Sequence, residues 1–342
     1  MGRKPRQTDA AVRARRAALA TPPEFGGDPV VWAAWLYYEE SLNQEEVAER
    51  LGISRATVVN FLQEARDRGI VTIAVATERL SQVALAHALA RRYGLDGCYV
   101  VPDDGGRRPD YERVGRAGAR LLAERLKPDD ILGVSWGRTV LSLSTAVPPL
   151  SLPHVSVVQV TGSAIGNYAF SPELCTSNIA SRIGGRCVNL HAPGIVSRPE
   201  VKAILMAEPS LVEQFALIRA CTKFVFGVTN VEASSMAFGS GYLTPDKSRP
   251  YVERGAVGVL FGRFFDAAGR PVHGVLDDCM IGLEIEEIAA IPERICIAAG
   301  LDKVAAIHGM LTAGHATLFV TDEPTARALT TIEEERPRLV AG

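Results

Sequence analysis

Apolar residues recur at helical spacing in three short runs near the start of the chain, separated by polar breaks. The first run follows an Asp-Pro pair at residue 28, which is typical of a helix start because aspartate caps and proline fits the first turn. The second run predicts a helix over residues 45–51, which Gly52 ends because a residue without Cβ accepts the left-handed turn. The third predicts a helix over residues 55–68, capped by Ser54. One small core is expected from Val47, Ala48, Leu51, Ile53, Val58, Phe61 and Leu62.

Farther along, short apolar runs alternate with longer segments of helical periodicity. The runs predict strands over residues 98–101, 131–135, 155–160, 224–228, 257–261, 294–298 and 316–320. Helices are expected over residues 80–93, 111–126, 139–145, 172–183, 199–207, 208–220, 302–311 and 323–329. Short strands that alternate with helices indicate an α/β fold with a Rossmann-like, mostly parallel sheet. Residues 70–76 are expected to form a strand or an extended connector between the two parts.

Composition narrows the class of protein. The chain has 342 residues, which corresponds to about two domains. Apolar residues make up 47% and charged residues 22%, which excludes a disordered, collagenous or coiled-coil chain over most of the length. We find neither a run of about 18 apolar residues nor the apolar stretch of a secretory signal, so no membrane partner is expected. Six cysteines without C-x-x-C spacing are typical of reduced thiols in a cytoplasmic protein.

Charge is unevenly distributed although the net charge is only −2. Residues 1–20 carry six basic residues against one acidic residue, whereas residues 21–76 carry four basic against nine acidic. We therefore expect three parts, namely a basic flexible arm over residues 1–27, a small helical domain over residues 28–76 and a larger α/β domain over residues 77–335. The arm is either a solvated tail or a segment that touches phosphates.

Residues 44–58 match the pattern of a helix-turn-helix. The motif needs a small residue at Ala48, where the two helices cross, and a glycine at the turn. In such motifs the N-terminal residues of the second helix enter the major groove, where arginine suits guanine or phosphate and asparagine suits adenine. The expected DNA contacts are Ser54, Arg55, Thr57 and Asn60. The alternative is a helical hairpin without a DNA role.

Small or glycine-bearing turns follow five of the expected strands, at residues 135–139, 161–164, 229–232, 262–266 and 299–303. Ligands of parallel sheets bind beyond the carboxyl ends of the strands, and a glycine turn leading into a helix suits phosphate. Lys303 would be disfavoured in the first turn of a helix unless an anion lies between the cation and the helix end. The candidate effector contacts are Gly137, Arg138, Thr139, Thr161, Gly162, Ser163, Asp266 and Lys303. Asp266 is expected to accept hydrogen bonds from sugar hydroxyls. The alternative is that it pairs with Arg263.

Several kinds of site are not predicted. The six histidines lack H-x-x-H or H-E-x-x-H spacing, so no metal site is expected. The phosphate-binding motif G-x-x-x-x-G-K-[ST], the dinucleotide motif G-x-G-x-x-G after a strand and the nucleophile motif G-x-S-x-G are all absent. We therefore assign no catalytic residue and no cofactor.

The motifs, taken together and in order, resemble the SorC family of bacterial sugar-binding transcriptional regulators. The resemblance rests on residues 35–58, 133–139, 262–269, 298–311 and 318–326. It implies a C-terminal domain related to sugar-phosphate isomerases and CoA-transferases, a homo-oligomer (usually a tetramer) and a phosphorylated sugar or polyol as effector. By this analogy the turn at residues 161–163 and Lys303 face phosphate. Three features differ from the usual family pattern. Arg138 stands where the family commonly has serine, the turn at 161–164 differs from the commoner Gly-Gly-containing turn, and Val59-Asn60 replaces a commoner Ser-Arg pair.

The leading hypothesis is a regulator that binds operator DNA in response to an effector, and it is not an enzyme. The alternative is a sugar-phosphate isomerase or CoA-transferase-like enzyme of the same fold, with Asp266 and Lys303 as acid–base groups. A third hypothesis is a sugar-phosphate-binding module without DNA binding, which the acidic balance of residues 21–76 keeps open.

Overall fold

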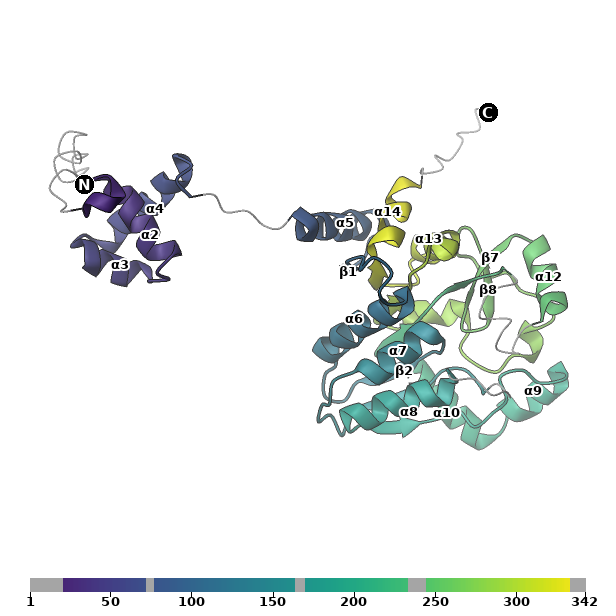
Figure 1. Ribbon diagram of the computed structural model, residues 1–342. Helices are drawn as coiled ribbons and strands as arrows, with labels where there is room; N and C mark the ends of the chain where they lie inside the picture. The colour runs from purple at the N-terminus through teal and green to yellow at the C-terminus, as the bar shows by residue number, and fades with distance from the viewer. Residues whose placement is uncertain (1–20, 72–76, 164–169, 233–243, 333–342) are drawn as a thin grey trace, which may run out of the picture. The chain divides into compact units, whose positions relative to one another are not determined.

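The computed structural model describes residues 21–71, 77–163, 170–232 and 244–332 (Figure 1). The chain divides into two compact units, residues 1–76 and 77–342, which we call the head and the sensor unit. Most of the expected basic arm and most of the connector at 70–76 lie outside the described residues.

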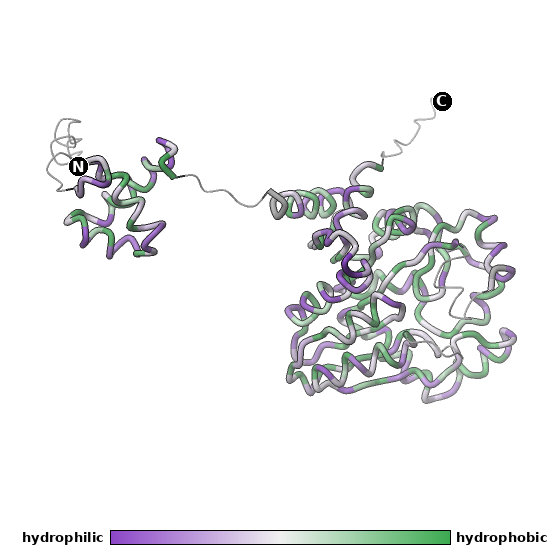
Figure 2. The backbone as a smooth tube through the Cα atoms, in the orientation of Figure 1, coloured by the Kyte–Doolittle hydropathy of each residue, from purple (hydrophilic) through white to green (hydrophobic). Residues whose placement is uncertain are grey.

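The described head consists of a short 3-10 helix and three α-helices. They are η1 (Pro23–Phe25), α2 (Pro29–Tyr38), α3 (Gln44–Leu51) and α4 (Arg55–Asp67). Each α-helix is capped by the side chain of the preceding residue, namely Asp28, Asn43 and Ser54, as the sequence predicted for the first and third. Apolar and polar stretches alternate along these helices (Figure 2). The predicted core is confirmed: six of its residues are buried, and Ile53 packs against them.

Seven parallel strands form the main sheet of the sensor unit, in the order β1-β10-β9-β5-β2-β3-β4. Their bounds are β1 (Gly97–Val101), β2 (Ile131–Val134), β3 (Ser156–Gln159), β4 (Arg186–Val188), β5 (Lys223–Phe226), β9 (Glu293–Ile297) and β10 (Leu318–Asp322). The predicted α/β fold with a parallel sheet is confirmed. Strand β4 was not predicted, because it is a short, largely exposed edge strand.

A second sheet has three antiparallel strands, β6 (Thr229–Asn230), β7 (Ala256–Leu260) and β8 (Arg263–Asp266). The strand predicted at 257–261 exists but belongs to this sheet. The turn predicted at 262–266 is wrong. Phe261 and Gly262, with φ of 37° and 99°, form the two-residue turn of a hairpin, and residues 263–266 are its second strand.

Helices and apolar clusters cover both faces of the main sheet. In the described residues of the sensor unit the α-helices are α5 (Thr77–Tyr93), α6 (Asp110–Arg125), α7 (Arg138–Ala146), α8 (Pro172–Ile183), α9 (Pro199–Met206), α10 (Pro209–Arg219), α12 (Pro245–Glu253), α13 (Val304–Thr312) and α14 (Glu323–Thr331). Three 3-10 helices add to them: η2 (Asp277–Cys279), η3 (Ile285–Ala290) and η4 (Leu301–Lys303). Helices α6, α7 and α8 lie side by side (Figure 1). All eight predicted helices are present, and α12 was not predicted.

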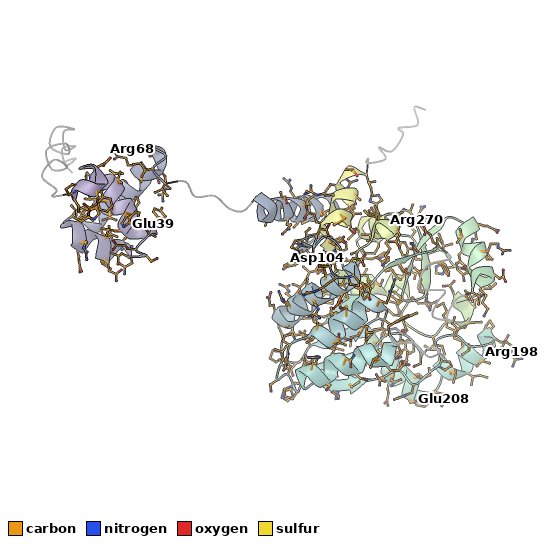
Figure 3. The ribbon with its side chains drawn as sticks, viewed as in Figure 1. Glu39, Arg68, Asp104, Arg198, Glu208 and Arg270 are labelled. Atoms are coloured by element: carbon orange, nitrogen blue, oxygen red, sulfur yellow. The ribbon has the colours of Figure 1, made fainter. Side chains whose placement is uncertain are left out.

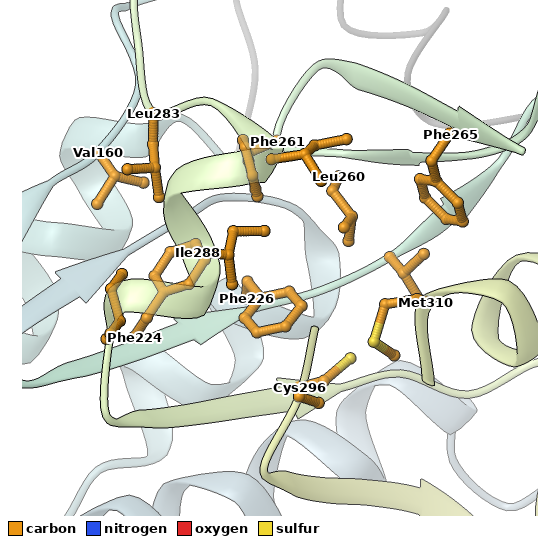
Figure 4. Close-up of a cluster of buried hydrophobic side chains, with 14 of the residues drawn as sticks. Val160, Phe224, Phe226, Leu260, Phe261, Phe265, Leu283, Ile288, Cys296 and Met310 are labelled. Carbon is orange, nitrogen blue, oxygen red and sulfur yellow. The ribbon is translucent and has the colours of Figure 1, made fainter. Parts of the chain in front are cut away.

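Strand β5 shows how the sheet separates its two cores. Phe224 and Phe226 point into one apolar cluster (Figure 4). Val225, between them, belongs to the other cluster. The first cluster also takes side chains from α10, α13 and α14, and the second from α6, α7 and α8. Because side chains alternate between faces, a strand covered on both faces is a continuous apolar run, which is why these strands were visible in the sequence.

Candidate functional site

The order of the strands reverses at one point of the main sheet, between β2 and β5. From β2 the chain proceeds through β3 to β4 on one side, and then returns to place β5 on the other side of β2. At such a reversal the connections after neighbouring strands diverge and leave a crevice at the carboxyl ends, where ligands of open α/β sheets bind.

A pocket lies at this crevice. Its wall is built from the segments that follow β2, β5 and β9, together with the β7–β8 hairpin and the start of α6. The lining residues are Tyr111, Trp136, Gly137, Arg138, Thr139, Val140, Gly227, Val228, Thr229, Val259, Phe261, Gly262 and Lys303. The space between these residues measures about 680 Å³ when its open mouth is included. The structure thus brings together four of the predicted effector contacts: Gly137, Arg138, Thr139 and Lys303.

Helix α7 begins at the pocket. Gly137 is its N-cap and has φ of 127°, a backbone conformation that favours glycine. Because a glycine cap has no side chain, it makes no hydrogen bond to the first N–H groups of the helix. These N–H groups and the positive end of the helix dipole form a ready anion site. Thr139, which is buried in the first turn, adds a hydroxyl.

Two cations line the same pocket. The guanidinium of Arg138 is exposed and lies 5.1 Å from the centre of the Tyr111 ring. Lys303 ends η4, just before α13, and its Nζ donates to the carbonyl oxygen of Ala299 at 3.2 Å. Neither cation forms an ion pair with a carboxylate of the described residues, and the lining contains no Asp or Glu. The pocket is therefore positively charged.

Three predicted contacts after β3 do not line this pocket. The Gly162 N–H donates to the Ile281 carbonyl and the Ser163 N–H to the Ala192 carbonyl, so both backbone donors are used in loop-to-loop bonds. Gly162 is packed so closely that an added Cβ would lie 2.6 Å from the Pro193 carbonyl oxygen. Thr161 is 1% exposed and bridges to Gly282. The backbone N–H groups of this turn are therefore engaged by neighbouring loops, and the prediction that residues 161–163 face phosphate stays a prediction. Residue 164 lies outside the described part of the chain.

Asp266, which was predicted to bind sugar hydroxyls, does not line this pocket either. It ends β8, and its carboxylate accepts hydrogen bonds from the Ala268 and Arg270 N–H groups, each at 2.9 Å. The Arg270 side chain, labelled in Figure 3, pairs with the same carboxylate at 2.8 Å. Asp266 does not line the pocket and closes the turn after β8 instead.

Arg263 has the structural role considered for it, with other partners. It is 3% exposed and pairs with Asp277 at 3.1 Å and with Glu284 at 2.7 Å. Burial raises the pKa of Glu284, although Arg263 and Lys202 oppose this shift. These ion pairs attach the β7–β8 hairpin, which forms one wall of the pocket, to η2 and to the loop before η3.

The apolar wall of the pocket was not predicted. Tyr111, Trp136 and Phe261 supply aromatic rings, and the Trp136 ring stacks on Phe170 with 6.3 Å between the centroids. Tyr111 lies in the first turn of α6 and follows none of the expected polar turns. A signal did exist for Trp136, because it stands inside the glycine turn after β2.

In the head, the predicted DNA contacts surround the start of α4. The Ser54 hydroxyl accepts the Thr57 N–H at 3.2 Å, so it caps the helix. Arg55 and Asn60 are exposed, and the Arg55 Nε donates to Gln44 Oε1 at 3.3 Å, joining the beginnings of α3 and α4. The opposite side of α4 is buried in the core of the head. The exposed face of α4 is therefore available at its N-terminal end, which is the end that helix-turn-helix proteins insert into the major groove of DNA.

The described residues contain neither a membrane-spanning helix nor a cluster of metal ligands. No helix in that part of the chain is long and apolar enough to cross a membrane. No group of three or more His, Cys, Asp or Glu side chains is arranged there to hold a metal ion.

Comparison with known proteins agrees with this geometry. Residues 77–331 match the protein family described as "Putative sugar-binding domain". The chain is 35% identical over 315 residues to the uncharacterized transcriptional regulator YjhU of Escherichia coli K12, covering 90% of this chain and 96% of that protein. It is 31% identical over 305 residues to the deoxyribonucleoside regulator of Bacillus subtilis 168, covering 87% and 95%. The full-length sorbitol operon regulator SorC of Klebsiella pneumoniae has the same fold, with a TM-score of 0.69, 26% identity and coverage of 88% and 97%.

Proposed function

Because this chain belongs to the SorC family of sugar-binding transcriptional regulators, we propose that its pocket binds a phosphorylated sugar or polyol and that its head reads operator DNA. Ligand-responsive transcriptional regulation is the function that its relatives share. Some of them are named for the deoxyribonucleoside, erythritol or sorbitol systems that they regulate, so polyhydroxylated effectors are in keeping with the family.

The observation that carries the effector proposal is the charge of the pocket. Lys303 and the uncapped start of α7 meet at the switch point of the sheet, and the lining contains no carboxylate. An anionic group satisfies both the backbone N–H groups and the lysine, while the aromatic wall packs against the carbon skeleton of a sugar. Phosphate is the anion that fits, since it accepts from several donors at once.

The enzyme alternative loses the residue on which it depended. The Asp266 carboxylate bonds to Arg270, and neither Asp266 nor any other carboxylate is among the described residues that line the pocket with Lys303. The relatives are named as regulators.

For the head, we propose that the beginning of α4 enters the major groove, with Arg55 and Asn60 at base edges or phosphates and with Ser54 and Thr57 at the backbone. Residues 21–76 of one head supply little phosphate affinity, because they carry four basic against nine acidic residues. A homo-oligomer, which we propose to be a tetramer, presents several heads and multiplies this weak binding. We place the protein in the bacterial cytoplasm, where operator DNA is found.

Two substitutions test the two halves of the proposal in one experiment. Lys303→Gln should abolish the thermal shift that phosphorylated sugars or polyols give to the full chain, because it removes a cation from the pocket lining. It should also abolish the effect of these ligands on operator binding, with unliganded DNA affinity intact. Arg55→Ala should weaken operator binding by about 1–3 kcal/mol and leave the thermal shift unchanged.

The controls follow from the structure. Arg66→Ala removes a cation from the last turn of α4, where it bonds to Tyr38 and Gln63, and should change operator affinity far less than Arg55→Ala. Unchanged operator affinity in Arg55→Ala would show that α4 is not the reading helix. Unchanged ligand response in Lys303→Gln would remove the pocket from the mechanism.

A further inference from the structure

Helix α9 lies on the surface of the sensor unit without being buried in it. None of its eight residues is buried, although most of them are apolar. Val201, Leu205 and Met206 pack against the core on one side of the helix. The Lys202 Nζ donates to the Asp277 carbonyl oxygen of η2 at 2.9 Å. The helix is therefore fixed on one side and open on the other.

The open side of α9 is apolar. Ala203, Ile204 and Ala207 are exposed at the spacing that places residues on one face of a helix, and Ile204 is 65% exposed. Val212, in the first turn of α10, and Val275, in the loop before η2, are exposed by 53% and 76%. Exposed apolar side chains that gather in one region mark an interaction surface, whereas single ones are ordinary.

Two charges of opposite sign stand at the two ends of this face. Arg198 directly precedes α9, and Glu208 follows the residue that ends it. Both are exposed and are labelled at the edge of the sensor unit in Figure 3. Neither side chain caps a helix, and the ion pairs of α9 and α10 in the described part of the chain are made by Lys202 and Arg219 instead. A cation at the beginning of a helix is disfavoured by the helix dipole unless an anion accompanies it.

This arrangement is self-complementary about a twofold axis. The residue midway between Arg198 and Glu208 is Ala203, which lies on the exposed apolar face beside Ile204. When two copies of α9 pack antiparallel with Ala203 near the axis, Arg198 of each copy meets the partner subunit's Glu208. Ile204 then packs beside the partner's Ala203, whose small side chain lets the helices approach closely. A twofold contact requires that the same patch serves both subunits, and this patch meets that condition.

We infer that α9 packs antiparallel against α9 of a second copy of this chain, with an Arg198–Glu208 pair at each end of the contact. The inference rests on the proposed function, which includes a homo-oligomer, and it names one surface of that oligomer. An apolar centre with charged pairs at its rim is typical of protein interfaces, where the centre provides affinity and the charges fix the orientation. The effector pocket is separate from this contact, because none of its described lining residues belongs to α9 or α10.

The test is sedimentation of the full chain over a range of concentrations, with single charge reversals. Arg198→Glu and Glu208→Arg each place like charges opposite one another at both ends of the contact, so each should weaken self-association at least about tenfold. An equal mixture of these two variants should associate as the wild type does, because every reversed residue then meets the opposite charge in its partner. Ile204→Asp places a charge in the apolar centre and should weaken the contact in every mixture.

The matched control is Arg116→Glu. Arg116 is an exposed arginine of α6 that pairs with Glu112 at 3.2 Å, away from α9 in the sequence and in the fold. Its reversal should leave self-association unchanged. Circular dichroism of every variant should match the wild type, which shows that a loss of association does not come from misfolding.

Two results would overturn the inference while leaving the proposed function in place. One is unchanged association in both reversals and in Ile204→Asp, which would place the contacts of the oligomer on other surfaces. The other is weakened association in both reversals without recovery in their mixture, which would exclude the antiparallel pairing. A wild-type chain that sediments as a monomer at every concentration would instead contradict the homo-oligomer of the proposed function, and the inference would fall with it.

Discussion

Asp266 illustrates how one carboxylate can serve folding at a place where sequence suggests ligand binding. Its side chain accepts two backbone N–H groups and the guanidinium of Arg270, all within the turn that follows β8. Burial alone would raise the pKa of Asp266, but the hydrogen bonds from Arg270 and from the Ala268 N–H outweigh it and hold the pKa below its ordinary value. A carboxylate with a lowered pKa stabilises the folded state at neutral pH.

We predict that Asp266→Asn lowers the free energy of unfolding by about 1 kcal/mol at pH 7, because the charged acceptor is lost from a partly exposed turn. The folded-state pKa lies below the unfolded value, so the stabilisation is complete above about pH 4 and disappears as the pH falls through the folded-state pKa. Urea unfolding of the wild type and of Asp266→Asn at several pH values should therefore show a difference in the free energy of unfolding that disappears in acid. Effector affinity should stay within about twofold of wild type. A large loss of effector affinity at constant stability would show that Asp266 contacts the effector after all.

The residues of the pocket divide into those that sequence revealed and those that it did not. Gly137 and Lys303 were predictable, because a glycine turn or a cation at a helix start after a buried strand is typical of anion binding. Thr161 and Asp266 have the same local pattern, but distant loops and Arg270 engage them instead. Tyr111 reaches the pocket only through the packing of α6, which a single sequence does not encode locally.

At the scale of elements, the main sheet was predictable and the second sheet was not. Strands buried on both faces, such as β5, are unbroken apolar runs, and helices such as α8 begin at a Ser-Pro cap and end at glycine. Strand β8 begins with a charged residue, Arg263, whose partners Asp277 and Glu284 lie farther along the chain. That charge is buried in a strand because these long-range ion pairs compensate it, and no local pattern reveals them.

One contact between elements connects the pocket to the start of the sensor unit. Helix α13 begins directly after Lys303, and its His308 Nδ1 lies 2.8 Å from the hydroxyl of Tyr93, near the end of α5. Burial and the neighbouring Arg92 lower the pKa of His308, so its ring is neutral at pH 7. Nδ1 can therefore accept a hydrogen bond from the Tyr93 hydroxyl. Helix α5 is the first element after the connector from the head. We therefore expect an effector that moves α13 to act on α5 through this hydrogen bond.

We predict that Tyr93→Phe keeps effector binding within about twofold and reduces the effect of the effector on operator affinity at least about threefold, since coupling energies are typically about 1–3 kcal/mol. Operator affinity would be measured by fluorescence anisotropy with and without saturating effector. Tyr99→Phe, which removes a hydroxyl from an exposed residue of β1, is the control and should retain the full response. If Tyr93→Phe also retains it, coupling does not pass through the contact between α5 and α13.

Across the whole molecule, the positive charge that DNA requires is concentrated in the first twenty residues. These residues carry a net charge of +5, from six basic and one acidic side chain, whereas residues 21–76 carry −5, from four basic and nine acidic. These two charges cancel, so the net charge of −2 comes from residues 77–342. A DNA-binding segment with net negative charge, such as residues 21–76, has little non-specific affinity by itself, because that affinity arises from releasing counterions at phosphates. We therefore expect residues 1–20 to supply most of the phosphate contacts.

Replacing the six basic residues of this segment by glutamine tests the expectation. The plot of log affinity against log salt should become shallower by up to about five per bound head, since each phosphate contact contributes about 0.9 to the slope. Discrimination between operator and unrelated DNA should increase, because the sequence-independent part of binding is lost while Arg55 and Asn60 remain. The same substitution should leave the thermal shift with effector unchanged, since the pocket belongs to the other unit. An unchanged salt slope would show that residues 1–20 are a solvated tail, and the phosphate contacts would then have to come from the oligomer, through several heads bound side by side.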